Sequence, residues 1–366
     1  MPEEVAGGPG PDRLAGSGGR GSDGGGSPRS RSLRSLRYGS TASPPPSDPR
    51  PSAWVRWAVD ALAESGVPSP RADAEILLGH VLEVGRGELQ RLLLLGTEMP
   101  DDAVRDFAEL VARRAERVPL QHLTGTAPFR HLELAVGPGV FVPRPETEQV
   151  AQVAVDAARR VVEATGRAVV VDLCTGSGAI ALAVATEVPG AEVHAVELDA
   201  DAHAWAARNV AAVREATGAV VHIVRGDARR ALTGPVDAGG LDAACDVVVS
   251  NPPYVPPDAV PRDPEVAEHD PAVALYGLGA DGLEVPRGVT AAAARLLRPG
   301  GVYVMEHAEV QAAAARAAVE ATGAFVGVRT AQDLTGRDRM VVAVRADATD
   351  GTGGAERSDG RGRLDP

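Results

Sequence analysis

The motif Asn251-Pro252-Pro253-Tyr254 follows directly after the valine-rich run "CDVVVS", and its groups are suited to holding a flat nitrogen group. Proline has no N–H, so the neighbouring carbonyl groups stay free of local turn bonds. The Asn251 side-chain oxygen and the Pro252 carbonyl can then converge on one NH₂ group, while the Tyr254 ring stacks on a π-system. This arrangement fits a carboxamide or an exocyclic base amine, whose lone pair can attack once both hydrogens are held aside.

A glycine-rich loop precedes this motif in the chain and has the form of a nucleotide-binding turn. Gly176 and Gly178 lie between the apolar run "AVVVDLC" and the helical pattern "GAIALAVATEV", where glycines allow close approach of a ligand. Glu197 ends the next strand-like run and can accept hydrogen bonds from both hydroxyls of a ribose. This pattern fits NAD or S-adenosylmethionine. Asp172 favours S-adenosylmethionine, because a carboxylate beside the loop would repel a pyrophosphate and suits a cationic methionine group.

The segment from residue 168 onward alternates strands and helices, which is the framework that these residues need. Such alternation predicts an α/β fold with a mostly parallel sheet wound on both faces. Ligands of such sheets bind beyond the carboxyl ends of the strands, where the glycine loop and the Asn251 motif both fall. The predicted strands are "AVVVDLC", "AEVHAVEL", "AVVHIVR", "AACDVVVS", "GGVYVMEH" and two more within residues 324–346.

The rest of the chain divides into segments of contrasting composition. Residues 1–50 and 347–366 are rich in Gly, Ser, Pro and charged residues, so we expect disordered tails. Apolar residues at helical spacing predict a small helical domain over residues 51–118. Residues 119–148 are expected to form a linker with a β-hairpin around Gly137-Pro138-Gly139. The sheet domain then occupies residues 149–346.

Composition excludes several classes of function. The formal net charge of −13 over 366 residues argues against a duplex DNA-binding protein, which needs a basic face. Cys174 and Cys245 form no CxxC or metal-ligand spacing, and no metal is predicted; a reduced, cytoplasmic setting is expected. The chain has no apolar run of the ~20 residues that span a bilayer, so no membrane association is expected.

Four motifs together resemble the release-factor glutamine methyltransferases, the PrmC/HemK family, over roughly residues 52–345. These are "FVPRPETE", "DLCTGSGAIALA", "SNPPY" and "HDPAVALYG…DGL". The resemblance implies a Rossmann-like class I methyltransferase sheet, mostly parallel with the last strand antiparallel, behind an N-terminal helical domain that docks the substrate. It also implies methyl transfer from S-adenosylmethionine, with S-adenosylhomocysteine as product, to the glutamine of the Gly-Gly-Gln motif in class-I peptide release factors.

The resemblance assigns roles by position. The loop would contact the methionine part of the cofactor, Glu197 the ribose, and Asp227 with Ala228 the adenine. Two positions depart from the family pattern: Cys174 stands where glycine is common, and Ala228 where some relatives carry an aromatic residue. The implied cofactor ligands are Asp172, Cys174, Thr175, Gly176, Ser177, Gly178, Glu197, Asp227, Ala228 and Asn251. The implied catalytic residues are Asn251, Pro252, Pro253 and Tyr254, which would also bind substrate together with Arg144 and Glu146.

Three alternatives remain open at this point. A glutamine methyltransferase acting on a ribosomal protein would share the Asn251 motif, and the "PRPETE" segment is the reason to prefer release factors. An adenine-amino DNA methyltransferase would have to grip a duplex and flip a base, which the acidic chain does not favour. A nicotinamide-dependent oxidoreductase would explain the glycine loop but would leave the Asn251 motif without a role.

Overall fold

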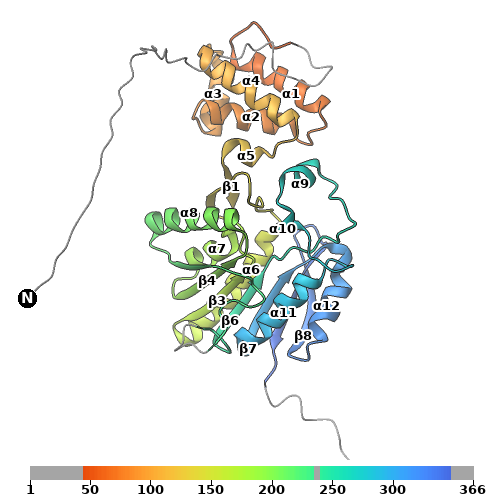
Figure 1. Ribbon diagram of the computed structural model, residues 1–366. Helices are drawn as coiled ribbons and strands as arrows, with labels where there is room; N and C mark the ends of the chain where they lie inside the picture. The colour runs from red at the N-terminus through yellow and green to blue at the C-terminus, as the bar shows by residue number, and fades with distance from the viewer. Residues whose placement is uncertain (1–43, 235–239, 348–366) are drawn as a thin grey trace, which may run out of the picture.

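The computed structural model of the protein describes residues 44–234 and 240–347, which form a helical unit followed by an α/β unit (Figure 1). Almost all of the two predicted disordered tails, 1–50 and 347–366, lie outside the described residues. None of the helices in the described ranges combines the length and the apolarity that crossing a membrane requires.

The helical unit is built around aromatic and aliphatic side chains at helical spacing. Trp54 and Phe107 are buried and meet edge to face at 6.5 Å between ring centroids, and Leu62 lies beside them in the same core. Proline opens the helix after the predicted break "SGVPSP", where its missing N–H costs no hydrogen bond. The helices are α1 (Pro51–Glu64), α2 (Pro70–Val81), α3 (Arg86–Leu95) and α4 (Asp101–Ala115).

The hairpin that connects the two units turns earlier than the sequence predicted. After the short helix α5 (Leu120–Thr124), strands β1 (Thr126–Phe129) and β2 (Leu132–Ala135) pair antiparallel. Phe129 pairs with Leu132, so the turn consists of Arg130 and His131, not of Gly137-Pro138-Gly139.

The two glycines predicted to form the turn instead allow the loop after β2 to pack on α8 (Ala200–Thr217). A Cβ at Gly137 would lie 2.6 Å from the ring of Trp205, and one at Gly139 would lie 2.9 Å from the Cβ of Asp201. The prediction of their role was wrong because their neighbour is a helix some sixty residues further along the chain, which no local pattern reveals.

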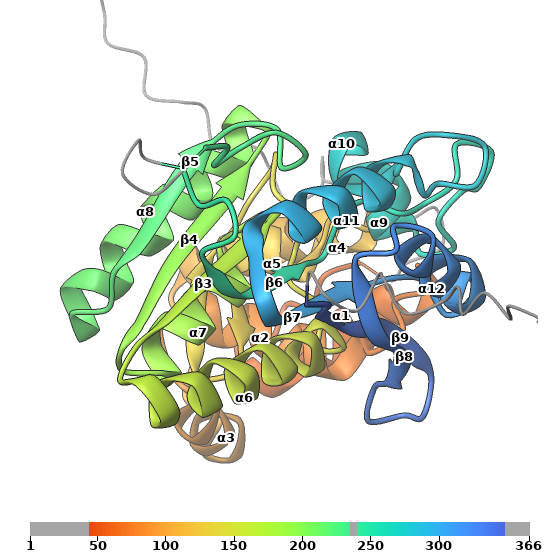
Figure 2. The same ribbon diagram turned by 90° about the horizontal axis from the view of Figure 1, so that it is seen from below.

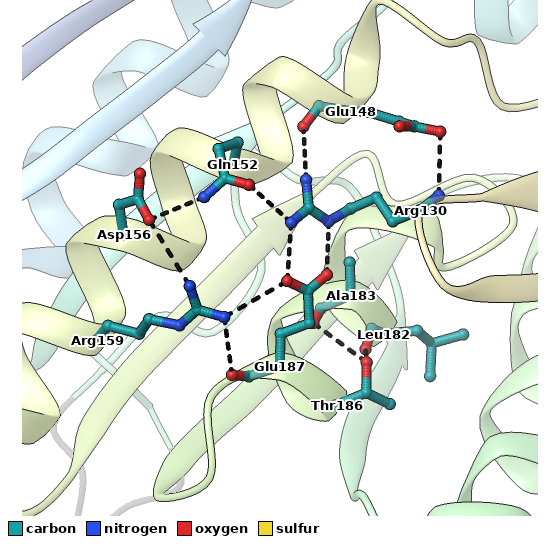
Figure 3. A network of polar contacts seen from close by, with 9 residues as sticks. All are labelled: Arg130, Glu148, Gln152, Asp156, Arg159, Leu182, Ala183, Thr186 and Glu187. Atoms are coloured by element: carbon teal, nitrogen blue, oxygen red, sulfur yellow. Dashed lines mark hydrogen bonds and ion pairs between the residues drawn. The ribbon is translucent and has the colours of Figure 1, made fainter.

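A network of charged groups fastens the hairpin turn to two helices of the α/β unit (Figure 3). The guanidinium of Arg130 pairs with Glu187 at the end of α7 (Ala179–Glu187), with Nε 2.5 Å from Oε1. Its Nη1 also donates to the carbonyl of Glu148 in α6 (Thr147–Thr165) at 3.2 Å. Because these groups are largely buried, the network sets the position of the linker on the α/β unit.

The α/β unit contains a seven-stranded sheet in the order β5-β4-β3-β6-β7-β9-β8, within the described residues. Neighbouring strands pair in parallel from β5 to β7, whereas β9 runs antiparallel to both of its neighbours. The predicted mostly parallel sheet with an antiparallel last strand is therefore confirmed. The strands are β3 (Ala168–Leu173), β4 (Ala191–Glu197), β5 (Val221–Arg225), β6 (Cys245–Ser250), β7 (Leu297–Glu306), β8 (Phe325–Gln332) and β9 (Asp338–Arg345).

Helices cover both faces of the sheet, as Figure 2 shows. The central strands β3 and β6 are buried along their whole length, which is typical of a doubly wound sheet. Alternate residues of β3 point to opposite cores: Val170 packs in the core with α6 and α7, and Val171 in the core with α11 (Glu284–Leu296) and α12 (Ala312–Glu320). The sequence analysis did not predict α6, although Val150, Ala151, Ala154, Val155 and Ala158 form a buried stripe at helical spacing.

Candidate functional site

The carboxyl ends of β3, β4 and β6 meet at one edge of the sheet and line a cavity of about 930 Å³. The Ser250 hydroxyl donates to the carbonyl of Leu173 at 2.6 Å and so ties the end of β6 to the end of β3. Residues 255–276, here called the cover, form part of the cavity wall and contain α9 (Pro264–His269) and α10 (Ala272–Leu275). The cover lies between the sheet edge and the helical unit (Figure 1).

The cavity gathers most of the residues predicted from the sequence. Asp172 and Gly178 are not among the residues that line it, and both remain predictions as ligands. The predicted residues on the wall are Arg144, Glu146, Cys174, Thr175, Gly176, Ser177, Glu197, Asp227, Ala228, Asn251, Pro252, Pro253 and Tyr254.

The backbone of the Asn251 motif is held by a glycine-bearing loop that follows the cover. A Cβ at Gly277 would lie 2.6 Å from the Pro253 carbonyl oxygen, and one at Gly282 would lie 2.4 Å from that of Tyr254. The side chain of Gln311 donates to the same Tyr254 carbonyl at 2.8 Å. The motif is therefore held from two sides, which explains the "YGLGADG" run that follows it.

Asn251 presents its amide between the first turn of α6 and the cavity. Its Nδ2 lies 3.4 Å from the hydroxyl oxygen of Thr147, which leaves the amide oxygen for other partners. Within residues 44–234 and 240–347, no hydrogen bond ends on the carbonyl oxygen of Pro252. The two acceptors predicted from the sequence thus lie on the cavity wall, and neither oxygen is engaged by a group within the described ranges.

Tyr254 contributes to the cavity wall and points its hydroxyl toward the end of β7. The hydroxyl oxygen lies 3.4 Å from Oε1 of Glu306. Burial, and then the nearby carboxylate, raise the pKa of Tyr254 well above its ordinary value, so the phenol stays neutral. A neutral, hydrogen-bonded tyrosine suits a stacking or positioning role and not that of a base.

The buried carboxyl of Asp172 holds the glycine loop by hydrogen bonds. Its Oδ2 accepts hydrogen bonds from the Thr175 hydroxyl at 2.6 Å and from the Ala181 N–H at 3.1 Å. Burial raises the pKa of Asp172 to about 7, although these two hydrogen bonds act to lower it. The carboxyl therefore joins the loop to the first turn of α7, a supporting role that the sequence analysis did not assign.

Glu197 lies on the cavity wall where β4 ends. Its two carboxylate oxygens accept hydrogen bonds from the N–H groups of Gly176 at 2.8 Å and Asp199 at 2.9 Å. Burial raises the pKa of Glu197, whereas these N–H donors favour the charged form. Each oxygen keeps a lone pair, so the carboxylate can still accept bonds from a vicinal diol.

Cys174 has a left-handed backbone, with φ of 63°, directly before the loop. This conformation suits glycine, which agrees with the noted departure from the family pattern. Burial, and then the neighbouring Glu197 and Asp172, raise the pKa of the Cys174 thiol far above its ordinary value. Cys174 is therefore a neutral wall residue and not a nucleophile.

The far end of the cavity carries a charged pair beside a small residue. Asp227 accepts hydrogen bonds from Arg229, with Nη2 2.7 Å from Oδ2, and this lowers the pKa of Asp227. Ala228 lies between these two residues in the sequence. It is buried, and its methyl side chain offers no flat surface. Arg229 also lines the cavity and was not predicted.

Arg144 joins the "PRPETE" segment to the cover. Its Nη2 lies 2.7 Å from Oδ2 of Asp270, a carboxyl with no exposed side-chain surface, and its guanidinium lies 4.9 Å from the ring centroid of Phe141. Burial raises the pKa of Asp270 to about 6, although Arg144 acts against this. Arg144 therefore supports the cover as well as lining the cavity.

The sequence analysis missed Glu306, a second strand-end carboxyl in this region. It is 2% exposed, and burial raises its pKa to about 7. The signal was present in the sequence, because Glu306 follows the apolar run "GGVYVM" just as Glu197 follows "AEVHAV".

Comparison with known proteins gives matches over both units of the chain. Family models match residues 53–125, as "PrmC N-terminal domain", and residues 138–264, as "Methyltransferase small domain". The release factor glutamine methyltransferase of Streptomyces coelicolor is 47% identical over 80% of this chain and 98% of its own length. The corresponding protein of Bifidobacterium longum is 42% identical over 79% and 98%.

A solved protein-(glutamine-N5) methyltransferase, release factor-specific, from Alicyclobacillus acidocaldarius is 26% identical. It covers 58% of this chain and 99% of its own, with a TM-score of 0.34. Each of the two sequence relatives matches about four-fifths of this chain, which is more than the α/β unit alone contains. On this evidence the chain belongs to the release factor glutamine methyltransferase family.

Proposed function

We propose that the protein transfers a methyl group from S-adenosylmethionine to the side-chain amide nitrogen of the glutamine in the Gly-Gly-Gln motif of class-I peptide release factors. One observation carries the proposal beyond family membership. Asn251 and Pro252, whose carbonyl accepts no hydrogen bond from the described part of the chain, lie on the same cavity wall as Glu197 and the glycine loop. A site for a planar NH₂ group therefore adjoins a site for a nucleoside.

The glycine-loop side of the cavity fits S-adenosylmethionine. The position where a Cβ would project from Gly176 is open for 4 Å, so a ligand can approach the backbone there. Thr175 to Gly178 would hold the methionine part, Glu197 the ribose hydroxyls, and Asp227 with Ala228 the adenine. When bound, S-adenosylmethionine supplies an electrophilic methyl group on a positively charged sulfur.

Asn251 and Pro252 prepare the glutamine nitrogen for attack. An amide nitrogen is a weak nucleophile because its lone pair is delocalised into the carbonyl group. The Asn251 side-chain oxygen and the Pro252 carbonyl each accept one N–H of the glutamine, so the lone pair faces the methyl group. When the nitrogen–carbon bond forms and the carbon–sulfur bond breaks, S-adenosylhomocysteine is left, and the methylated nitrogen is strongly acidic and loses one proton to water. No side chain is needed as a base, which agrees with the neutral Tyr254.

The helical unit docks the release factor and sets its orientation to the cavity. Support comes from a contact of the helical unit with the cover: Arg114 of α4 and Arg117, which follows α4, both donate to Glu265 of α9. The helical unit is thus joined directly to the segment that walls the cavity. A substrate protein held by the helical unit would present its glutamine loop beside the cover.

The test is single-turnover methylation of a purified class-I release factor, with its motif glutamine intact or replaced by glutamate. We expect transfer to the intact protein alone. Asn251→Ala should lower the rate about 10²–10³-fold, the usual cost of losing one preorganised polar contact at a reacting centre. S-adenosylhomocysteine affinity should stay within about twofold, because Asn251 orients the nucleophile. Equal transfer to both release factors, or an undiminished rate for Asn251→Ala, would refute the proposal.

A ribosomal-protein glutamine is the runner-up substrate, because its amide presents the same group to Asn251. A competition assay with equal concentrations of the two proteins separates the candidates by their ratio of kcat/KM. The family assignment and the "PRPETE" segment favour the release factor. A preference for the ribosomal protein would leave the proposed chemistry unchanged and would give the protein a different biological substrate.

A further inference from the structure

The ends of β6 and β7 place a buried carboxyl beside the residue that aligns the substrate. These strands pair in parallel with Ser250 opposite Met305, so the next positions along them are Asn251 and Glu306. Glu306 is 2% exposed and therefore not a solvated surface charge. A buried carboxyl in such a position needs hydrogen-bond donors, because burying one without partners is costly.

The surroundings of Glu306 offer two such donors. The Tyr254 hydroxyl lies 3.4 Å from Oε1, while Oε2 has no hydrogen-bond partner among the residues that the structure describes. Thr147, the first residue of α6, is 4% exposed, and its hydroxyl interacts with the Glu306 carboxyl so as to lower the pKa of that group. The hydroxyls of Thr147 and Tyr254 are thus the two groups that can donate to the buried carboxyl.

Thr147 also faces Asn251, with 3.4 Å between the hydroxyl oxygen and Nδ2. A hydroxyl group has one proton to donate and lone pairs that accept. If Thr147 donates its proton to Glu306, its oxygen can act toward Asn251 as an acceptor alone. The NH₂ of Asn251 must then face Thr147, and its oxygen must face the cavity.

We propose that Glu306 and Thr147 form a polar relay that fixes the orientation of the Asn251 amide, so that its oxygen and not its NH₂ meets the substrate. The proposal rests on the proposed function, since it assigns positioning residues for the glutamine amide. The relay answers a chemical problem, because the two ends of an asparagine amide have nearly the same shape. A reversed amide would set two NH₂ groups against each other and would expel the glutamine nitrogen.

Thr147 must donate to Glu306 only while Glu306 is ionised, because a carboxylate accepts hydrogen bonds and never donates them. The charged and titratable groups that act on it are Arg339 of β9, Glu146 before α6, and Tyr254. Burial outweighs Arg339 and raises the pKa of Glu306 to about 7. Protonation below this value would allow the carboxyl to donate to Thr147 and so remove the orientation of Asn251. Methyl transfer should therefore become faster as pH rises through about 7.

The experiment compares Thr147→Val, which keeps the shape and removes the hydroxyl, with Thr147→Ser, which restores it. Single-turnover methylation of the release factor should fall at least about fivefold in the valine variant and recover in the serine variant. S-adenosylhomocysteine affinity and Tm should stay close to wild type in both. Glu306→Gln should slow transfer and abolish the rise in rate near pH 7. Glu309→Gln, an exposed neighbour outside the cavity, is the matched control and should behave as wild type.

The outcomes distinguish a failure of the proposed function from a failure of the relay. If the wild-type enzyme does not methylate the release factor, the proposed function fails and the relay with it. If the wild type is active and Thr147→Val loses less than about fivefold, the relay alone is refuted. Loss of activity in both Thr147→Val and Thr147→Ser also refutes it, because the serine keeps the donor. The Thr147 pair keeps the test decisive even if Glu306→Gln fails to fold.

Discussion

Glu265→Gln should uncouple the helical unit from the cover while leaving the cofactor site unchanged. Glu265 accepts hydrogen bonds from Arg114 Nη2 at 2.7 Å and from Arg117 Nε at 2.8 Å and Nη2 at 2.6 Å. The Glu265 side chain is 14% exposed, and the Arg114 side chain, which also pairs with Asp73, is 6% exposed. This cluster joins α4, α2 and α9 in a partly desolvated contact.

The expected magnitude follows from these contacts. The hydrogen bonds of the two arginines hold the pKa of Glu265 at about 2, although burial acts in the opposite direction. A hydrogen bond to a charged group contributes roughly 1.5–3 kcal/mol and a neutral one about 1, before solvent screening reduces the difference. Because Glu265→Gln replaces the carboxylate by a neutral amide, we expect its contact with the two arginines to weaken by about 2 kcal/mol in total. Since 1.4 kcal/mol is a factor of ten, kcat/KM on whole release factor should fall about ten- to thirtyfold.

The assay measures kcat/KM on the whole release factor, S-adenosylhomocysteine affinity by calorimetry, and Tm. The double variant with Arg117→Gln should lose less than the sum of the two single losses, because both changes break one contact. Glu88→Gln, which removes a charge from an exposed pair with Arg91 on α3, is the matched control and should leave activity unchanged. If Glu265→Gln lowers Tm but keeps kcat/KM within about twofold, the contact is purely structural and the docking role of the helical unit is wrong.

Three further predictions concern the cavity. Glu197→Ala should weaken S-adenosylmethionine binding at least about tenfold, because each charge-assisted bond to a ribose hydroxyl contributes roughly 1.5–3 kcal/mol; unchanged calorimetric affinity would remove Glu197 from that site. Cys174→Gly should raise the free energy of unfolding by about 1 kcal/mol or leave it unchanged. Glycine relieves the strain of the left-handed backbone, but it also makes the unfolded chain more flexible. A clear destabilisation in urea titrations would show that the backbone at Cys174 is not strained. Asp172 and Glu306 both have pKa values raised to about 7, above those of the unfolded chain, so their stabilising contribution is complete below about pH 4 and is lost as pH rises to about 7. Glu306→Gln should therefore reduce the fall in unfolding free energy between pH 5 and pH 8, and an unaltered slope would show that Glu306 does not titrate there.

Local patterns predicted the strands and most of the helices because each element buries one face, and that face repeats with the period of the element. The central strands β3 and β6 were recognised as continuous apolar runs, as expected for strands buried on both sides. The hairpin was misplaced because Gly137 and Gly139 look like turn residues. Their need for glycine comes from Trp205 and Asp201, which lie far along the chain.

The strand pattern was enough to predict which residues lie at the edge of the sheet where ligands bind. In a parallel sheet all carboxyl ends lie on one side, so strand-end residues such as Glu197 and Asn251 had to converge. Tertiary structure alone decided which partners those residues meet. Thr147 reaches Asn251 from 104 positions away, and Glu265 reaches Arg117 from 148. Such contacts depend on the packing of helices against the sheet edge, and a pattern that repeats over a few residues carries no information about them.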